Sequence, residues 1–126
     1  MACRITELVV DCSDPDRLAV FWSGVLGYVE TDREADAVEI APAGADPSGL
    51  LPRLVFSRSD EPKREKLRLH VDVNATDRDQ DAELARLLAL GAVPADVGQT
   101  GSESWHVLAD PEGNEFCLLR RRVPVA

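Results

Sequence analysis

The sequence predicts an α+β fold made of two tandem βαβββ modules, at about residues 4–59 and 66–121. Three observations support this prediction. Short runs of β-branched residues alternate with two longer stretches of helical period. Both helical stretches end in Leu-Gly, at Leu26-Gly27 and Leu90-Gly91. The order of elements therefore occurs twice, which indicates an internal repeat within one domain of residues 1–126.

The first module is predicted to begin with a strand at residues 5–10 and to continue as a helix over residues 16–26. Asp14 is a suitable N-cap, Pro15 fits the first turn, and Gly27 suits the C-terminal cap. Three further strands are expected at residues 28–31, 37–41 and 53–58. The apolar side of the helix should face the core; it comprises Leu18, Val20 or Phe21, Trp22 and Val25.

The second module repeats this order. A strand is predicted at residues 67–73, and a helix then runs to about Leu90, capped at its start by Thr76 or Asp77. Leu84, Leu87 and Leu88 should lie on its apolar side, and Gly91 ends it. The remaining strands are expected at residues 92–97, 104–109 and 114–119.

Composition limits the possible partners. The formal net charge of −9 should repel nucleic acid and anionic membranes, so we expect neither as a partner. The three cysteines are widely spaced, which fits neither a disulfide framework nor a zinc knuckle and indicates a reducing compartment. No leader or membrane span is recognisable. We therefore expect a cytoplasmic protein, present as a homodimer, that binds a small molecule.

Several motifs resemble a known superfamily. The paired modules, the opening DPDRLAVFWSGVLGY and the later ADPEGNEFCLL are similar to the vicinal oxygen chelate superfamily, which includes glyoxalase I, extradiol dioxygenases and bleomycin resistance proteins. The run LVFSRSDEPKREKLRLHVDV further resembles its small, actinobacterial-type glyoxalase-like subgroup. The resemblance covers nearly the whole chain. It implies a cupped mixed sheet, with helices on the convex side and a cavity on the concave side.

The same resemblance implies positions for metal ligands. They fall on Glu7, His70 and Cys117, with a fourth position near Ser57. This set is incomplete, because serine is a poor ligand and a soft thiolate does not suit the oxygen-rich sites of nickel or manganese. Two alternatives remain open: the protein binds a divalent metal ion, or it binds no cofactor. The loss of two carboxylate-type positions argues against full glyoxalase I activity.

Strand alternation gives an independent reason to single out Glu7 and His70. Glu7 should share one face of its strand with Val9, and Arg68, His70 and Asp72 should share one face of theirs. If the repeat brings these strands together, Glu7 and His70 meet and form a general acid/base pair that needs no metal. These two are the predicted catalytic residues. The alternative is a solvated sheet face.

Four further residues are predicted to line the cavity: Ser57, Arg68, Trp105 and Cys117. Trp105 and His106 should point to opposite sides of their strand, and Trp105 is the better platform for a flat ligand. Cys117 between Phe116 and Leu118 can also be an ordinary buried thiol.

Two functions from different classes follow. The first is a lyase or isomerase that moves a proton on an oxygenated metabolite, with Glu7 and His70 as its catalytic groups. The second is a non-catalytic protein, similar to bleomycin resistance proteins, that sequesters a small cationic molecule. The negative net charge favours the second function, whereas the retention of both Glu7 and His70 favours the first.

Overall fold

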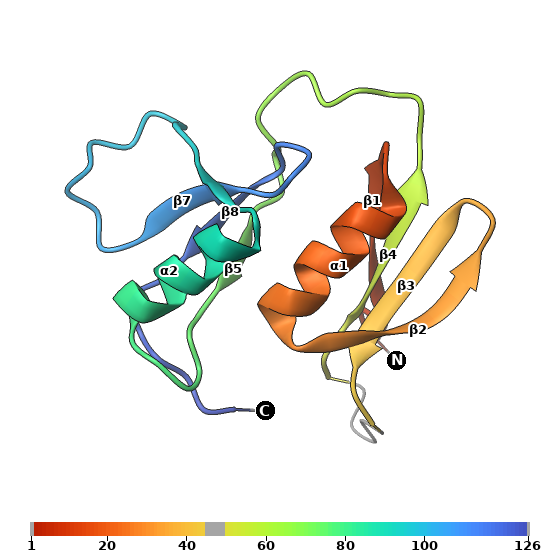
Figure 1. Ribbon diagram of the computed structural model, residues 1–126, viewed down its shortest axis with the longest axis horizontal. Helices are drawn as coiled ribbons and strands as arrows, with labels where there is room; N and C mark the ends of the chain where they lie inside the picture. Colours follow the sequence, from red (N-terminus) through yellow and green to blue (C-terminus); the bar gives the residue numbers. More distant parts are fainter. Residues whose placement is uncertain (1, 45–49, 126) are drawn as a thin grey trace. The chain divides into compact units, whose positions relative to one another are not determined.

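The computed structural model describes residues 2–44 and 50–125 and shows an α+β fold (Figure 1). The chain divides into two compact units, residues 1–62 (unit 1) and residues 63–126 (unit 2). Each unit contains one four-stranded sheet and one helix in the order βαβββ. The predicted fold class and the predicted repeat of elements are confirmed.

Unit 1 forms a sheet with the strand order β1-β4-β3-β2. Strands β1 and β4 are parallel, and the other neighbours are antiparallel. Helix α1 connects β1 to β2 and packs against β2, β3 and β4. The elements are β1 (Glu7–Cys12), α1 (Pro15–Leu26), β2 (Tyr28–Glu34), β3 (Ala37–Pro42) and β4 (Arg53–Arg58).

Alternation along the strands places the core of unit 1 on one face of its sheet. Leu54 and Phe56 on β4 are buried, and so are Val38 and Ile40 on β3. The side chain of Val9 on β1 belongs to the other face and is 59% exposed. The predicted apolar side of the helix is confirmed, and of the two alternatives Phe21 is buried whereas Val20 is exposed. The buried residues of α1 also include Leu18, Trp22 and Val25.

Helix α1 begins and ends at the predicted signals. The Asp14 carboxylate accepts a hydrogen bond from the Arg17 backbone N–H at 3.2 Å, which satisfies a donor that the first turn leaves open. Gly27 ends the helix with φ of 70°, a left-handed conformation that favours glycine. The rings of Phe21 and Trp22 meet edge to face in the core.

Unit 2 forms a second sheet with the order β5-β8-β7-β6, in which β5 and β8 are parallel. Its elements are β5 (Val71–Val73), α2 (Gln80–Leu90), β6 (Val93–Pro94), β7 (His106–Ala109) and β8 (Glu115–Leu118). Neither of the two described helices is long and apolar enough to span a membrane.

Three predictions for unit 2 need correction. Strand β5 begins at Val71 rather than at residue 67, so His70 directly precedes the strand. The N–H of Leu67 donates to the Glu115 carboxylate, and Leu69 is 70% exposed, so the predicted alternation does not extend through residues 67–69. Helix α2 is capped by Asp79, whose carboxylate accepts from the Ala82 N–H at 2.8 Å.

The third correction concerns the apolar side of α2. Leu87 is fully buried as predicted, whereas Leu88 is 40% exposed. Buried Glu83 occupies part of this side, and its carboxylate pairs with the Arg86 guanidinium at 2.6 Å. Pairing with arginine lets the carboxylate stay in a largely buried position.

Side-chain hydrogen bonds stabilise the turn between β7 and β8. Asp110 is buried, and its carboxylate accepts hydrogen bonds from the backbone N–H groups of Glu112 and Asn114. Gly113 has φ of 86°, which favours glycine. This turn sets the register in which β7 and β8 pair.

Candidate functional site

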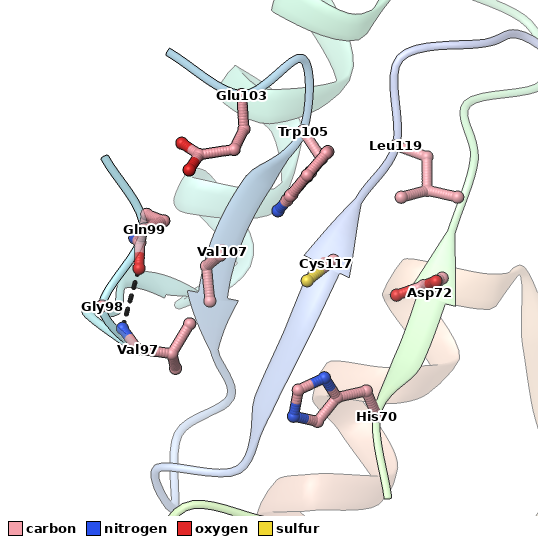
Figure 2. A pocket seen from close by; sticks show the side chains of 10 residues that line it. All are labelled: His70, Asp72, Val97, Gly98, Gln99, Glu103, Trp105, Val107, Cys117 and Leu119. Atoms are coloured by element: carbon pink, nitrogen blue, oxygen red, sulfur yellow. Dashed lines mark hydrogen bonds between the residues drawn. The ribbon is translucent and has the colours of Figure 1, made fainter. Parts of the chain in front are cut away.

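An open pocket of about 560 Å³ lies on one face of the unit 2 sheet, and we call it the unit 2 pocket (Figure 2). Three residues on neighbouring strands form its floor. Cys117 on β8 pairs in register with Asp72 on β5 and with Val107 on β7, so the three side chains point to the same face. The opposite face carries the buried core residues Phe116, Leu108 and Leu118. The core thus holds these three strands in place beneath the pocket.

His70 contributes the imidazole of the pocket. Its ring extends from the segment just before β5 toward the middle of the pocket (Figure 2). Its Nε2 atom lies 2.6 Å from the Nζ atom of Lys66. Lys66 was not predicted, because in a non-helical segment a spacing of four residues gives no signal that two side chains meet.

Cys117 lies beside the Asp72 carboxylate. Partial burial raises the pKa of the Cys117 thiol, and the negative charge of Asp72 raises this pKa further. The positive charge of Lys66 acts in the opposite direction. The net shift is upward, so the thiol is protonated at neutral pH and is a weak nucleophile.

A loop forms the wall next to β7, and Glu103 organises it. The Glu103 carboxylate accepts hydrogen bonds from the backbone N–H groups of Thr100 and Gly101 and from the Thr100 hydroxyl. The hydrogen bond from the Thr100 backbone is the main reason that the pKa of Glu103 falls to about 2. Glu103 therefore keeps its negative charge at neutral pH. Sequence reasoning missed it, because its role depends on the loop conformation.

Gln99 stabilises the same wall. Its side-chain amide donates to the Ala95 carbonyl at 2.7 Å and accepts from the Val97 N–H at 2.8 Å. Trp105 directly precedes β7 and is 44% exposed, and it lines the pocket together with Val107. His106 is the intervening residue and is not among the lining residues. The pocket thus combines an imidazole, two carboxylates and an aromatic ring.

The other predicted site residues lie elsewhere. Arg68 is exposed, two residues before His70, and is not among the lining residues of the unit 2 pocket. Glu7 is exposed on unit 1 and lines a hollow of about 170 Å³ with Val55 and several charged residues of β2 and β3. Glu7 and His70 belong to different units, each of which is described by itself. Their meeting stays a prediction.

The strand register identifies Val55 as the counterpart of Cys117. Glu7 and His70 occupy matching places in the repeat, and so do Val9 and Asp72, two residues further along each strand. Val9 pairs in register with Val55, and Asp72 pairs with Cys117. Ser57 pairs with Asp11 instead. The fourth position of the expected ligand set is therefore held by an apolar side chain.

These residues do not fit a divalent metal ion. Within each unit, the described residues contain no group of three or more His, Cys, Asp or Glu side chains that could hold one. Beside the unit 2 pocket, the Lys66 ammonium contacts the Nε2 atom of His70. Metal ions bind histidine through an imidazole nitrogen with a free lone pair. The Nε2 atom is therefore already engaged by another cation.

Comparison with known proteins identifies similar sequences and folds. The family model described as glyoxalase-like domain matches residues 7–119. No curated protein matches this sequence. A glyoxalase/bleomycin resistance protein/dioxygenase family enzyme from Burkholderia phytofirmans is 14% identical with a TM-score of 0.68. That match covers 92% of this chain and 97% of the other.

Two fosfomycin resistance proteins called FosX also have similar folds. The Listeria monocytogenes protein, in a complex with Mn(II) and dihydroxypropylphosphonic acid, is 15% identical with a TM-score of 0.70. The match covers 94% of this chain and 90% of that one. The Mesorhizobium loti protein is 14% identical with a TM-score of 0.68, and the match covers 94% and 92% of the two chains. At these sequence identities, the similarity shows a shared fold and does not extend to function.

Proposed function

This chain belongs to the glyoxalase-like domain family, and on that premise we propose that it binds an oxygenated metabolite in the unit 2 pocket and moves a proton on it, as lyases and isomerases do. The observation that carries the proposal is the pocket itself. Its volume of about 560 Å³ lies within the usual range for small-molecule sites. Its lining combines apolar side chains with a few polar groups, which is typical of such sites.

The chemistry assigns different roles to Glu7 and His70. This chemistry has as its premise the predicted meeting of Glu7 with His70, and the Glu7 carboxylate is then the proposed base that takes a proton from a carbon next to a carbonyl group. The C–H electron pair then forms a carbon–carbon double bond, and the carbonyl electrons move to oxygen to give an enolate. His70 donates a hydrogen bond to that oxygen, and return of the proton completes the reaction. Full glyoxalase I activity is not proposed, because the residues do not fit its metal.

Exchange with deuterated water tests this function directly. Small 2-oxo acids and α-hydroxy ketones would be incubated with the protein in D2O, and NMR would follow the loss of the proton next to the carbonyl. We expect exchange with at least one of these compounds, and its loss in Glu7→Gln and in His70→Gln. Glu61→Gln, which changes an exposed carboxylate of unit 1, serves as the control. Exchange that persists in both site variants would overturn the assignment.

A second candidate is sequestration of a small cationic molecule without catalysis. The charges in the pocket favour it, because the carboxylates of Asp72 and Glu103 and the exposed ring of Trp105 all attract a cation. In a Trp22→Phe variant, the fluorescence of Trp105 alone would report ligand entry. Fluorescence changes with quaternary ammonium aromatics, together with no proton exchange in any compound tested, would favour this function over proton transfer.

A further inference from the structure

Lys66 contacts the His70 ring, and this contact limits what the unit 2 pocket can bind. The Lys66 Nζ atom lies 2.6 Å from His70 Nε2 and 3.4 Å from the carbonyl oxygen of Leu67. An ammonium group has three N–H donors and no lone pair. In this contact Lys66 is therefore the donor and Nε2 the acceptor, an arrangement that places the single proton of a neutral His70 ring on Nδ1.

The segment that carries Lys66 is anchored on both sides. The Lys63 Nζ atom lies 2.8 Å from Glu115 Oε2, and the Leu67 N–H donates to Glu115 Oε1 at 3.0 Å. The Glu115 side chain is only 10% exposed and starts β8, the strand that carries Cys117. Residues 63–67 are thus attached to the sheet beneath the pocket. The Lys66 charge also acts on the Cys117 thiol, so its electrostatic effect extends into the pocket.

A metal ion on His70 would need the atom that Lys66 already contacts. Metal–nitrogen bonds of about 2.0–2.1 Å use the lone pair of the neutral imidazole. That lone pair accepts the hydrogen bond from Lys66. A lysine ammonium and a divalent ion cannot both occupy this position, because they would compete for one lone pair and repel each other.

We propose that the Lys66 ammonium takes the place of a metal ion on the His70 ring, beside the unit 2 pocket. It fixes the His70 ring with its proton on Nδ1, and it supplies a positive charge beside the ring. The Nδ1–H group and the remaining ammonium N–H groups then bind an anionic oxygen of the ligand, such as a carboxylate, enolate or phosphonate oxygen. The inference rests on the proposed function in one respect, namely that the ligand binds beside His70.

The position of the His70 proton is the first test. Long-range ¹H–¹⁵N correlation spectra at neutral pH distinguish a protonated ring nitrogen from one with a free lone pair. We expect Nδ1–H in the wild-type protein and in Lys66→Arg, since arginine also only donates. Lys66→Met should shift His70 toward the Nε2–H form, whereas Arg64→Gln should leave the spectrum unchanged. His106 is the internal reference. A wild-type His70 with Nε2–H would overturn the proposal.

The second test uses Mn²⁺ alone. The wild-type protein should show no stoichiometric broadening of the His70 ring signals by this paramagnetic ion, and Lys66→Met should show more broadening than Lys66→Arg. Equal, stoichiometric broadening in all three proteins would contradict the proposal. A failure of the proposed function can be told apart from a failure of this inference, because proton exchange in D2O is measured separately. Exchange that requires His70 but is unaffected in Lys66→Met would leave that function standing and refute the role of Lys66.

Discussion

Cys117 shows how a neighbouring side chain decides the chemistry of a cysteine. A thiol in a pocket is a candidate nucleophile when its pKa is lowered, and here the shift has the opposite sign. Burial and the Asp72 carboxylate both disfavour the thiolate and raise the pKa of Cys117. The residue therefore contributes shape to the pocket floor, and the proposed chemistry does not use it.

The raised pKa of Cys117 leads to a prediction for its alkylation. At each pH near neutrality, Cys117 should react with iodoacetamide more slowly than exposed Cys3, because a raised pKa leaves less thiolate. Peptide mass spectrometry of one sample compares both cysteines.

The substitution Asp72→Asn provides the control for this prediction. Removing the carboxylate should lower the pKa of Cys117 and speed its alkylation, while the rate at Cys3 stays the same. Equal rates at Cys117 before and after the substitution would show that Asp72 does not act on the thiol.

Single residues of the candidate site were predictable to different degrees. His70, Trp105 and Cys117 could be selected from their types and from their places in the repeat, and all three line one pocket. Lys66 and Glu103 could not be selected. Their roles depend on an irregular segment and a loop, where sequence spacing does not determine which groups meet.

At the scale of elements, the start of α2 shows which of two suitable aspartates serves as its N-cap. Asp77 matches Asp14 of the first module in sequence, yet α2 begins after Asp79. The Asp77 carboxylate is paired with the Arg78 guanidinium at 3.0 Å, whereas Asp79 accepts from the Ala82 backbone. Both residues are good N-caps, so composition could not decide between them.

The two aspartates therefore make a matched pair of variants. Asp79→Ala should lower the free energy of unfolding by about 1 kcal/mol, because it leaves a backbone donor of the first turn of α2 without its partner. Asp77→Ala removes only an exposed ion pair and should cost clearly less than Asp79→Ala. Urea unfolding followed by circular dichroism measures both. A cost for Asp77→Ala that equals that of Asp79→Ala would show that the cap is misassigned.

At the scale of the whole molecule, the last strand of each unit carries one large aromatic core residue. Phe56 on β4 and Phe116 on β8 are both fully buried, at 0% and 1% exposure. Each lies on the face opposite to the polar residues of its sheet. The two sheets are thus built alike, with a packed face and a face that carries the functional candidates.

Truncation of either phenylalanine should destabilise the protein strongly. Phe56→Ala and Phe116→Ala should each cost about 3–5 kcal/mol, because each leaves a cavity that the surrounding side chains fill only in part. Thermal unfolding measures the loss. Val20→Ala, which changes an exposed side chain of α1, is the control and should cost less than about 1 kcal/mol. A loss below this control value for either phenylalanine would contradict the described core.

The sequence by itself determined the order of elements, the repeat and the fold class, because these follow from hydrophobic periodicity and from caps such as Asp14 and Gly27. It also selected His70, Trp105 and Cys117. Only the tertiary structure decided the contact of Lys66 with His70, the register that pairs Val55 with Val9, and the loop around Glu103. Periodicity is a property of neighbours along the chain, whereas these contacts depend on how distant or irregular segments meet in space.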